Sequence, residues 1–145
     1  MTLVPGERLV IDASVAVKWV VSEPGSELAE PLLDRALVAP DLLFAECANI
    51  LWKKVRRGEL TTEEAAVAAQ TLEQADITVV STKAYLGAAT SIAIELDHPA
   101  YDAVYLAMAE AQGLRYVTAD NRLARKVRDG DSRFQQMLVI LADTA

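Results

Sequence analysis

Short apolar runs alternate along this chain of 145 residues with longer segments in which apolar residues recur every three or four positions. The short runs are typical of buried strands, and the longer periodic segments are typical of helices. Strands are predicted at residues 9–11, 37–39, 77–80, 115–118 and 137–141. Helices are predicted at residues 15–21, 27–36, 41–55, 61–75, 81–96, 99–112 and 121–128. This alternation favours right-handed crossovers and a three-layer α/β/α sandwich with a five-stranded parallel sheet.

Five residues give local signals for helix boundaries. Asp41 is a typical N-cap, and Thr61 with Glu64 three residues later matches a capping box. Pro99 is tolerated at a first helical position, and Gly113 is a typical stop signal. These signals support the helices that begin near residues 41, 61 and 99.

The composition fits one compact domain over residues 1–145, because 52% of the residues are hydrophobic and 24% are charged. The single cysteine, Cys47, cannot form an internal disulfide, and the chain does not open with a sequence of signal-peptide type. No apolar run approaches the roughly 18 to 20 residues that span a bilayer. We therefore expect a soluble, cytoplasmic protein.

Four acidic residues lie where burial is expected. Asp12 ends the first apolar run, and Asp120 follows the fourth by two residues. Glu46 and Asp102 lie near the starts of apolar helices. Because helices that follow parallel strands begin at the carboxyl edge of the sheet, all four carboxylates are expected at that edge, where ligands bind in open α/β folds.

Four clustered carboxylates repel one another and need a compensating cation. Pairing with Arg or Lys could supply that charge, but Mg²⁺ or Mn²⁺ suits an all-oxygen ligand set better. One histidine and one cysteine do not make a zinc site. Taken singly, each acid has a simpler explanation. Asp12 and Asp120 can cap helices, Glu46 can extend to solvent, and Asp102 can stabilise a helix N-terminus.

Four segments carry a family resemblance: residues 10–19 (VIDASVAVKW), 40–49 (PDLLFAECAN), 98–107 (HPAYDAVYLA) and 118–120 (TAD). Their order and separation resemble the motifs of PIN-domain nucleases, specifically the VapC-type toxins of toxin–antitoxin pairs. The resemblance spans essentially the whole chain and implies a five-stranded parallel sheet.

The resemblance also implies a metal-dependent endoribonuclease that uses Mg²⁺ or Mn²⁺. The family's acids carry over onto Asp12, Glu46, Asp102 and Asp120, and Ser14 and Thr118 become polar neighbours of the metal site. Some members have one more acid a few residues later, where this chain has Asn121 and then no acid before Asp129. An antitoxin partner and a homodimer are implied as well.

Basic residues form two short clusters although the formal net charge is −7. They lie at residues 53–57 and 122–128. Cations are favoured near helix C-termini, so solvation explains them, but an acidic site that binds RNA also needs cations beside it. The RNA-contact candidates are Lys53, Arg56, Arg122 and Arg125.

The other candidate side chains have structural interpretations. Cys47 and the aromatic residues are expected in the core or at dimer contacts, although aromatic side chains can also stack on bases. His98 is expected as a helix-start residue. The aromatic residues concerned are Trp19, Trp52, Tyr101 and Tyr105.

Two other functions remain open at this point. A phosphatase of the haloacid dehalogenase type has a second aspartate two residues after the first, where this chain has Ser14. A non-catalytic module of PIN-like architecture would bind metal without cleaving RNA.

Overall fold

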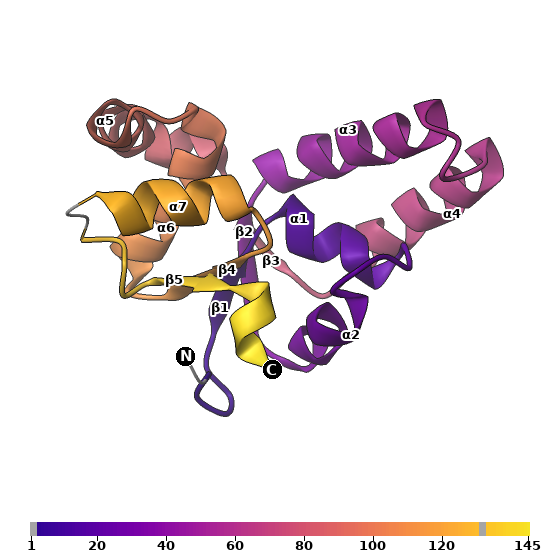
Figure 1. The fold of residues 1–145 in the computed structure, drawn as a ribbon, viewed down its shortest axis with the longest axis horizontal. Helices are drawn as coiled ribbons and strands as arrows, with labels where there is room; N and C mark the ends of the chain where they lie inside the picture. Colours follow the sequence, from indigo (N-terminus) through magenta and orange to yellow (C-terminus); the bar gives the residue numbers. More distant parts are fainter. Residues whose placement is uncertain (1–2, 131–132) are drawn as a thin grey trace.

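The computed structural model describes residues 3–130 and 133–145 and contains a five-stranded parallel sheet between helices (Figure 1). The strands are β1 (Leu9–Ile11), β2 (Leu37–Pro40), β3 (Thr78–Val80), β4 (Arg115–Thr118) and β5 (Leu138–Ile140). Their order is β3-β2-β1-β4-β5, and every neighbouring pair is parallel. The predicted parallel sheet is confirmed.

The longer helices fall where the periodic pattern predicts them. They are α3 (Leu42–Arg56), α4 (Thr62–Glu73), α5 (Leu86–Leu96), α6 (Ala100–Gln112) and α7 (Asn121–Asp129). Shorter helical segments complete the fold: α1 (Ala13–Ala16), η1 (Val17–Trp19), α2 (Ser26–Ala29), η2 (Glu30–Asp34), η3 (Thr82–Tyr85) and η4 (Leu141–Thr144), where η denotes a 3₁₀ helix.

Side chains alternate along each strand and so divide the core into two halves. On β1, Leu9 and Ile11 face the half covered by α1 to α4, whereas Val10 faces the half covered by α5 to α7. On β4, Val117 and Tyr116 divide in the same way. The two halves confirm the three-layer α/β/α arrangement.

Three predicted helices are interrupted. The helix expected at residues 15–21 is α1 followed by η1, and that expected at residues 27–36 is α2 followed by η2, where Pro31 lies in the first turn of the 3₁₀ segment. Proline has no amide hydrogen and cannot continue an α-helical hydrogen-bond ladder. The helix expected from residue 81 begins with η3, which Ser81 caps by accepting a hydrogen bond from the amide of Lys83.

The expected caps are confirmed at two helices and differ at two others. Thr61 and Glu64 form the reciprocal capping box, and Gly113 takes a left-handed conformation after α6. Pro99 is the N-cap of α6 rather than its first residue. Asp41 precedes α3 without capping it, because the Thr82 hydroxyl accepts from the Leu42 amide while donating to Asp41 Oδ1.

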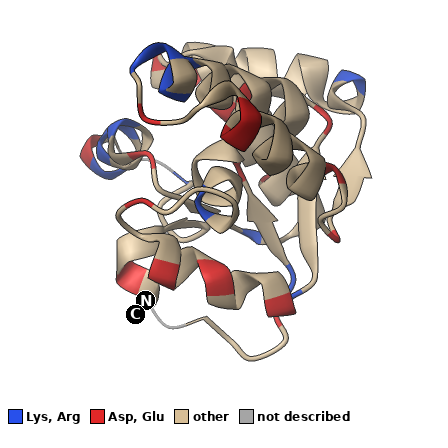
Figure 2. Cartoon of the chain, turned by 90° about the vertical axis from the view of Figure 1, so that its right-hand side faces the viewer, with Lys and Arg blue, Asp and Glu red and all other residues tan. Residues whose placement is uncertain are grey.

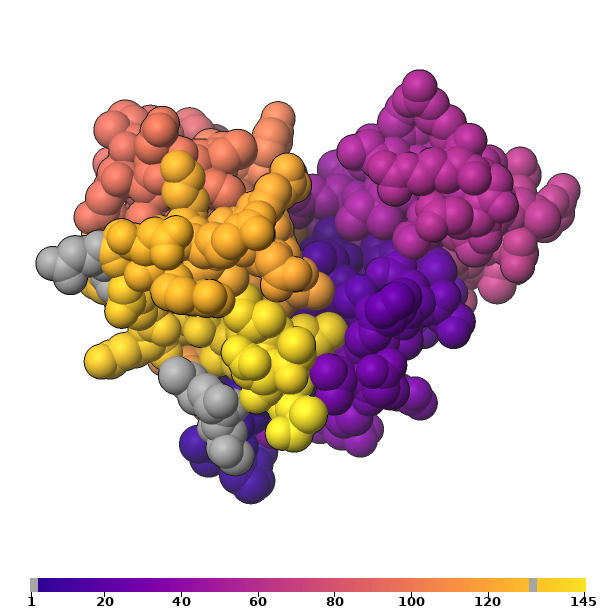
Figure 3. All heavy atoms as spheres, viewed as in Figure 1, coloured from indigo at the N-terminus to yellow at the C-terminus, as the bar shows by residue number. Residues whose placement is uncertain are grey.

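The helices form two groups with a hollow between them. Figure 3 shows a notch between the spheres of α5 and α7 on one side and those of α3 and α4 on the other. In Figure 1, α3 and α7 both begin beside the carboxyl edge of the sheet and point away from each other. No helix within the described residues is long and apolar enough to span a bilayer.

Candidate functional site

The carboxyl ends of β1 and β4 lie next to each other at the carboxyl edge of the sheet. Ile11 pairs with Val117 in the parallel register, so Asp12 and Thr118 are direct neighbours. Both side chains are buried, Asp12 with 5% of its surface exposed. The adjacent strand ends that the sequence predicts are therefore present.

Asp12 is held by four hydrogen-bond donors. Its Oδ1 accepts from the Ser14 hydroxyl at 2.5 Å and from the amide of Val15 at 3.3 Å. Its Oδ2 accepts from the hydroxyls of Tyr116 at 2.6 Å and Thr118 at 2.5 Å. Burial raises the pKa of Asp12 despite these donors, and repulsion from Asp102 raises it further.

Glu46 projects from the second turn of α3 and receives one hydrogen bond. The Tyr105 hydroxyl on α6 donates to Glu46 Oε1 at 2.5 Å, and the Tyr105 ring stacks on that of Tyr116 with centroids 5.4 Å apart. Burial raises the pKa of Glu46 to about 7, and repulsion from Asp12 and Asp102 acts in the same direction. The charges of Asp12 and Asp102, two other predicted site residues, thus act on the pKa of Glu46.

Asp102 lies in the first turn of α6 and is paired with the one histidine of the chain. His98 Nε2 lies 2.6 Å from Asp102 Oδ2. Burial raises the pKa of Asp102, the hydrogen bond from His98 opposes that rise, and the charge of Asp120 adds to it. Asp120 caps α7 by accepting a hydrogen bond from the amide of Arg122 at Oδ1.

Three of the four acids have one carboxylate oxygen to spare. Within the described residues, no hydrogen bond reaches Oε2 of Glu46, Oδ1 of Asp102 or Oδ2 of Asp120. None of these oxygens is fully buried without a partner. The edge therefore offers free, mutually repelling carboxylate oxygens beside a fully hydrogen-bonded Asp12.

This donor set fits a hard divalent cation. Oxygen ligands with net negative charge are those that Mg²⁺ and Mn²⁺ prefer. The nearby Cys47 is buried, and burial raises the pKa of its thiol to about 12, so it offers no thiolate. No group of three or more His, Cys, Asp and Glu side chains in residues 3–130 and 133–145 already stands in a metal-binding arrangement.

Ser14 and Thr118 link the two turns at this edge. Ser14 Oγ accepts from the amide of Ala119 at 2.9 Å and lies 3.4 Å from Thr118 Oγ1, which accepts from the amide of Asp120. These contacts join the turn after β1 to the turn after β4. They place the turn that carries Asp120 next to the turn that carries Asp12.

Sequence reasoning missed three hydrogen-bonding partners of the acids: Tyr105, Tyr116 and His98. Tyr105 was expected in the core or at a dimer contact, and it is fully buried. A buried tyrosine hydroxyl needs a polar partner, and Tyr105 follows Asp102 by three residues on one helix. This spacing was the available signal, and it indicated that Tyr105 faces the acids.

The basic candidates are exposed, whereas one of their neighbours is not. Lys53, Arg56, Arg122 and Arg125 are exposed, but Lys54 pairs with Glu23 at 2.9 Å. Figure 2 shows basic segments at the end of α3 and in α7. Arg56 also lies over the exposed ring of Trp52, 5.5 Å from its centroid.

The aromatic residues divide between buried and exposed positions. Trp19 is half-buried and donates to the carbonyl of Ala29 at 2.8 Å. Cys47 and Tyr105 belong to the core as expected. Trp52 and Tyr101 do not, because 54% and 64% of their surfaces are exposed.

The sequence is similar to known proteins over most of its length. Residues 9–129 match the family model of the PIN domain. Ribonuclease VapC3 of Pyrobaculum aerophilum is 37% identical over 123 residues, covering 82% of this chain and 94% of that protein. Ribonuclease VapC3 of Mycobacterium tuberculosis is 33% identical over 123 residues, covering 83% and 88%.

Solved structures share the fold. The crystal structure of PAE2754 from Pyrobaculum aerophilum matches with a TM-score of 0.69 at 20% identity, covering 96% of this chain and 93% of that chain. Mycobacterium tuberculosis VapC20, a sarcin-ricin loop cleaving toxin, matches with a TM-score of 0.58 at 16% identity, covering 76% and 86%. Together with the sequence matches, this likeness shows that the chain belongs to the PIN domain family, among the VapC-type ribonucleases.

Proposed function

We propose that the chain is a divalent-metal-dependent endoribonuclease and the toxin of a toxin–antitoxin pair. The observation that carries the proposal is the set of free oxygens on Glu46, Asp102 and Asp120, next to the buried carboxylate of Asp12. Their mutual repulsion is relieved when a cation binds between them. Mg²⁺ or Mn²⁺ is the ion that this ligand chemistry favours.

Asp102, Asp120 and Asp12 hold the ion in this proposal, and Glu46 binds it directly or through water. When bound, the ion supplies Lewis-acid stabilisation of the charge that develops on the phosphate and on the attacking water. Asp12 can offer an oxygen to the ion only if one of the four groups that donate hydrogen bonds to it turns away. The Ser14 hydroxyl is suited to that, because Thr118 Oγ1 lies 3.4 Å from it as a second acceptor.

The chain's own side chains also handle the proton of the attacking water. Glu46 Oε2 is the candidate acceptor, since Tyr105 occupies only Oε1. The Tyr105 hydroxyl fixes the position of the carboxylate, and burial of Tyr105 raises the pKa of that hydroxyl, so it remains a donor. Hydrolysis by this route leaves a 5′-phosphate and a 3′-hydroxyl, as the family resemblance implies.

RNA contacts on both sides of the notch follow from the exposed cations. Lys53 and Arg56 lie at the far end of α3, and Arg122 and Arg125 lie on α7. They would hold phosphates on either side of the cleaved bond.

An antitoxin and a second copy of the chain complete the proposal, as they do for VapC-type toxins. A basic side chain of the antitoxin can compete with metal for the clustered carboxylates. We place the homodimer and its antitoxin complex in the cytoplasm.

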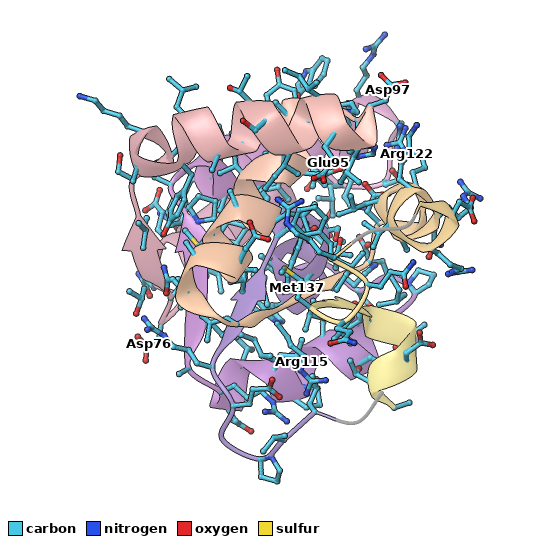
Figure 4. The ribbon with its side chains drawn as sticks, turned by 90° about the vertical axis from the view of Figure 1, so that its left-hand side faces the viewer. Asp76, Glu95, Asp97, Arg115, Arg122 and Met137 are labelled. Carbon is cyan, nitrogen blue, oxygen red and sulfur yellow. The ribbon has the colours of Figure 1, made fainter. Side chains whose placement is uncertain are left out.

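The test is cleavage of total RNA by the antitoxin-free chain with Mg²⁺, Mn²⁺ or a chelator, alongside Asp102→Asn. Discrete fragments are expected only with metal, and Asp102→Asn should abolish them while the chain stays folded. Asp76→Asn is a matched control, because Asp76 is exposed at a corner distant from Arg122 (Figure 4). Unchanged cleavage by folded Asp102→Asn would overturn the site, and metal binding without cleavage would favour the non-catalytic module.

A further inference from the structure

His98 is placed against Asp102 by the backbone that joins α5 to α6. Asp97 is the one described non-glycine residue with positive φ, at 49°, and it ends α5 in a left-handed conformation. The amide of His98 then donates to the carbonyl of Ala93 at 3.1 Å, which fixes the turn. Pro99 follows His98 as the N-cap of α6, and its ring fixes its own φ angle.

This turn closes the C-terminus of α5 through backbone hydrogen bonds from the amides of Asp97 and His98 to the carbonyls of Ile94 and Ala93. A left-handed conformation costs an aspartate more than a glycine, and glycine is the usual residue at such a helix end. The result is a histidine side chain with only 11% of its surface exposed, aimed at an acid that is 20% exposed. The turn thus leaves the His98 ring within hydrogen-bond distance of Asp102.

The contact engages one oxygen of Asp102 and leaves the other free. His98 Nε2 lies 2.6 Å from Oδ2, whereas Oδ1 accepts no hydrogen bond from the described residues. An ionised carboxylate can only accept hydrogen bonds, so in that state of Asp102 the contact requires the proton on Nε2. The hydrogen bond fixes the rotation of the carboxylate and therefore the direction of Oδ1.

We propose that His98 is a positioning residue for the metal site, which orients Asp102 so that Oδ1 faces the divalent ion. This inference rests on the proposed function, because it assigns a role around the same ion. Histidine and carboxylate partners outside the ligand set commonly orient metal ligands in this way. Neither the charged nor the neutral form of the ring is required, since both donate from Nε2.

Arg122 is the other cation that acts on Asp102, but it does not fix the carboxylate. It lowers the pKa of Asp102 only through its charge, and 83% of its side chain is exposed. Figure 4 shows Asp97 and Arg122 at the same corner of the molecule, at the end of α5 and the start of α7. His98 is therefore the residue that determines the direction of Oδ1.

Two amide substitutions at His98 distinguish the loss of the hydrogen bond to Asp102 from the loss of side-chain volume. The side-chain nitrogen of His98→Gln reaches about as far as Nε2, whereas that of His98→Asn stops near the position of Nδ1 and cannot reach Oδ2. Mn²⁺ affinity of the full chain, measured by titration calorimetry, should fall roughly 10- to 100-fold in His98→Ala and His98→Asn. His98→Gln should recover most of that loss, and the thermal midpoints should show that all three variants fold.

The single histidine also gives a direct spectroscopic signal. In the metal-free wild type, the ring nitrogens should show that Nε2 carries the proton. Addition of Mg²⁺ should shift the ring resonances of His98, and this shift should vanish in Asp102→Asn. A side chain with only a packing role would not respond to Mg²⁺ in this way.

The outcomes distinguish the two proposals. If the wild type binds neither Mg²⁺ nor Mn²⁺, the proposed function fails. If the wild type binds Mn²⁺ and folded His98→Ala binds it equally well, the positioning role is wrong while the proposed function stands. Equal affinities of His98→Gln and His98→Asn would also overturn the positioning role, because reach to Oδ2 would then be irrelevant.

Discussion

Asp12 and Asp102 differ in how much their substitution should lower the free energy of unfolding. Asp12 accepts four hydrogen bonds from the turns after β1 and β4 and from Tyr116, so it holds the two strand ends together. Asp102 is bound through one oxygen from a neighbour on the same segment. Substitution at Asp12 therefore changes stability and chemistry together, whereas substitution at Asp102 tests the chemistry alone.

The buried hydrogen bond from Tyr116 to Asp12 gives the first prediction. Tyr116→Phe leaves Asp12 Oδ2 with Thr118 alone, and a lost hydrogen bond to a charged group costs about 1.5–3 kcal/mol. Urea denaturation should show this loss. Tyr101→Phe is the matched control and should change the free energy of unfolding little, because Tyr101 is 64% exposed. Equal stabilities of Tyr116→Phe and the wild type would mean that Asp12 does not depend on this donor.

At the scale of elements, apolar runs predict the strands well because β1, β2, β4 and β5 are largely buried on both faces, whereas β3 at the sheet edge is mostly exposed. The interrupted helices were harder to predict, since periodicity over one or two turns does not separate an α-helix from a 3₁₀ helix. The role of Thr82 was equally hard to predict, because it caps α3 from 40 residues away in the sequence. The four acids could be placed from strand ends and helix starts, but their hydroxyl and imidazole partners depend on tertiary packing.

Glu23 forms ion pairs with Lys18 of η1 and Lys54 of α3. These ion pairs predict how the stability of the fold depends on pH. The Glu23 carboxylate lies 2.8 Å from Lys18 Nζ and 2.9 Å from Lys54 Nζ. Burial acts to raise the pKa of Glu23, but the two lysines outweigh it and lower the pKa below the ordinary 4.5. A lowered pKa stabilises the fold above the ordinary value, and this contribution is lost as the pH falls through the folded-state pKa.

Glu23→Gln should therefore cost about 1 kcal/mol at neutral pH, a value in the range of partly exposed ion pairs. The difference in free energy of unfolding from the wild type should stay constant from pH 8 to about pH 5 and shrink below about pH 4.5. Glu59→Gln is the control, because Glu59 is exposed and has no ion pair in the described part of the chain. A difference that grows on acidification would contradict this assignment.

At the scale of the whole molecule, α3 and α7 both begin at the acidic edge and both carry basic residues, at the far end of α3 and along the whole of α7. We propose that RNA lies in the notch of Figure 3, between the helices that carry the two basic clusters. This arrangement reconciles RNA binding with a net charge of −7, because the distribution of cations matters more than their sum. It also separates Lys53, which is free to bind phosphate, from Lys54, which is paired with Glu23.

The last prediction tests whether the two basic clusters bind one RNA. In an Asp102→Asn background, which prevents cleavage, RNA affinity should fall steeply with salt, with the slope of log K against log salt reduced by roughly 0.7 for each lost contact to single-stranded RNA. Alanine at Lys53 and Arg56, or at Arg122 and Arg125, should each lower the slope, and all four together should lower it by the sum. Lys54→Ala should leave the slope unchanged, because its charge is already neutralised by Glu23. If only one pair of substitutions changes the slope, RNA contacts one cluster and the notch is not spanned.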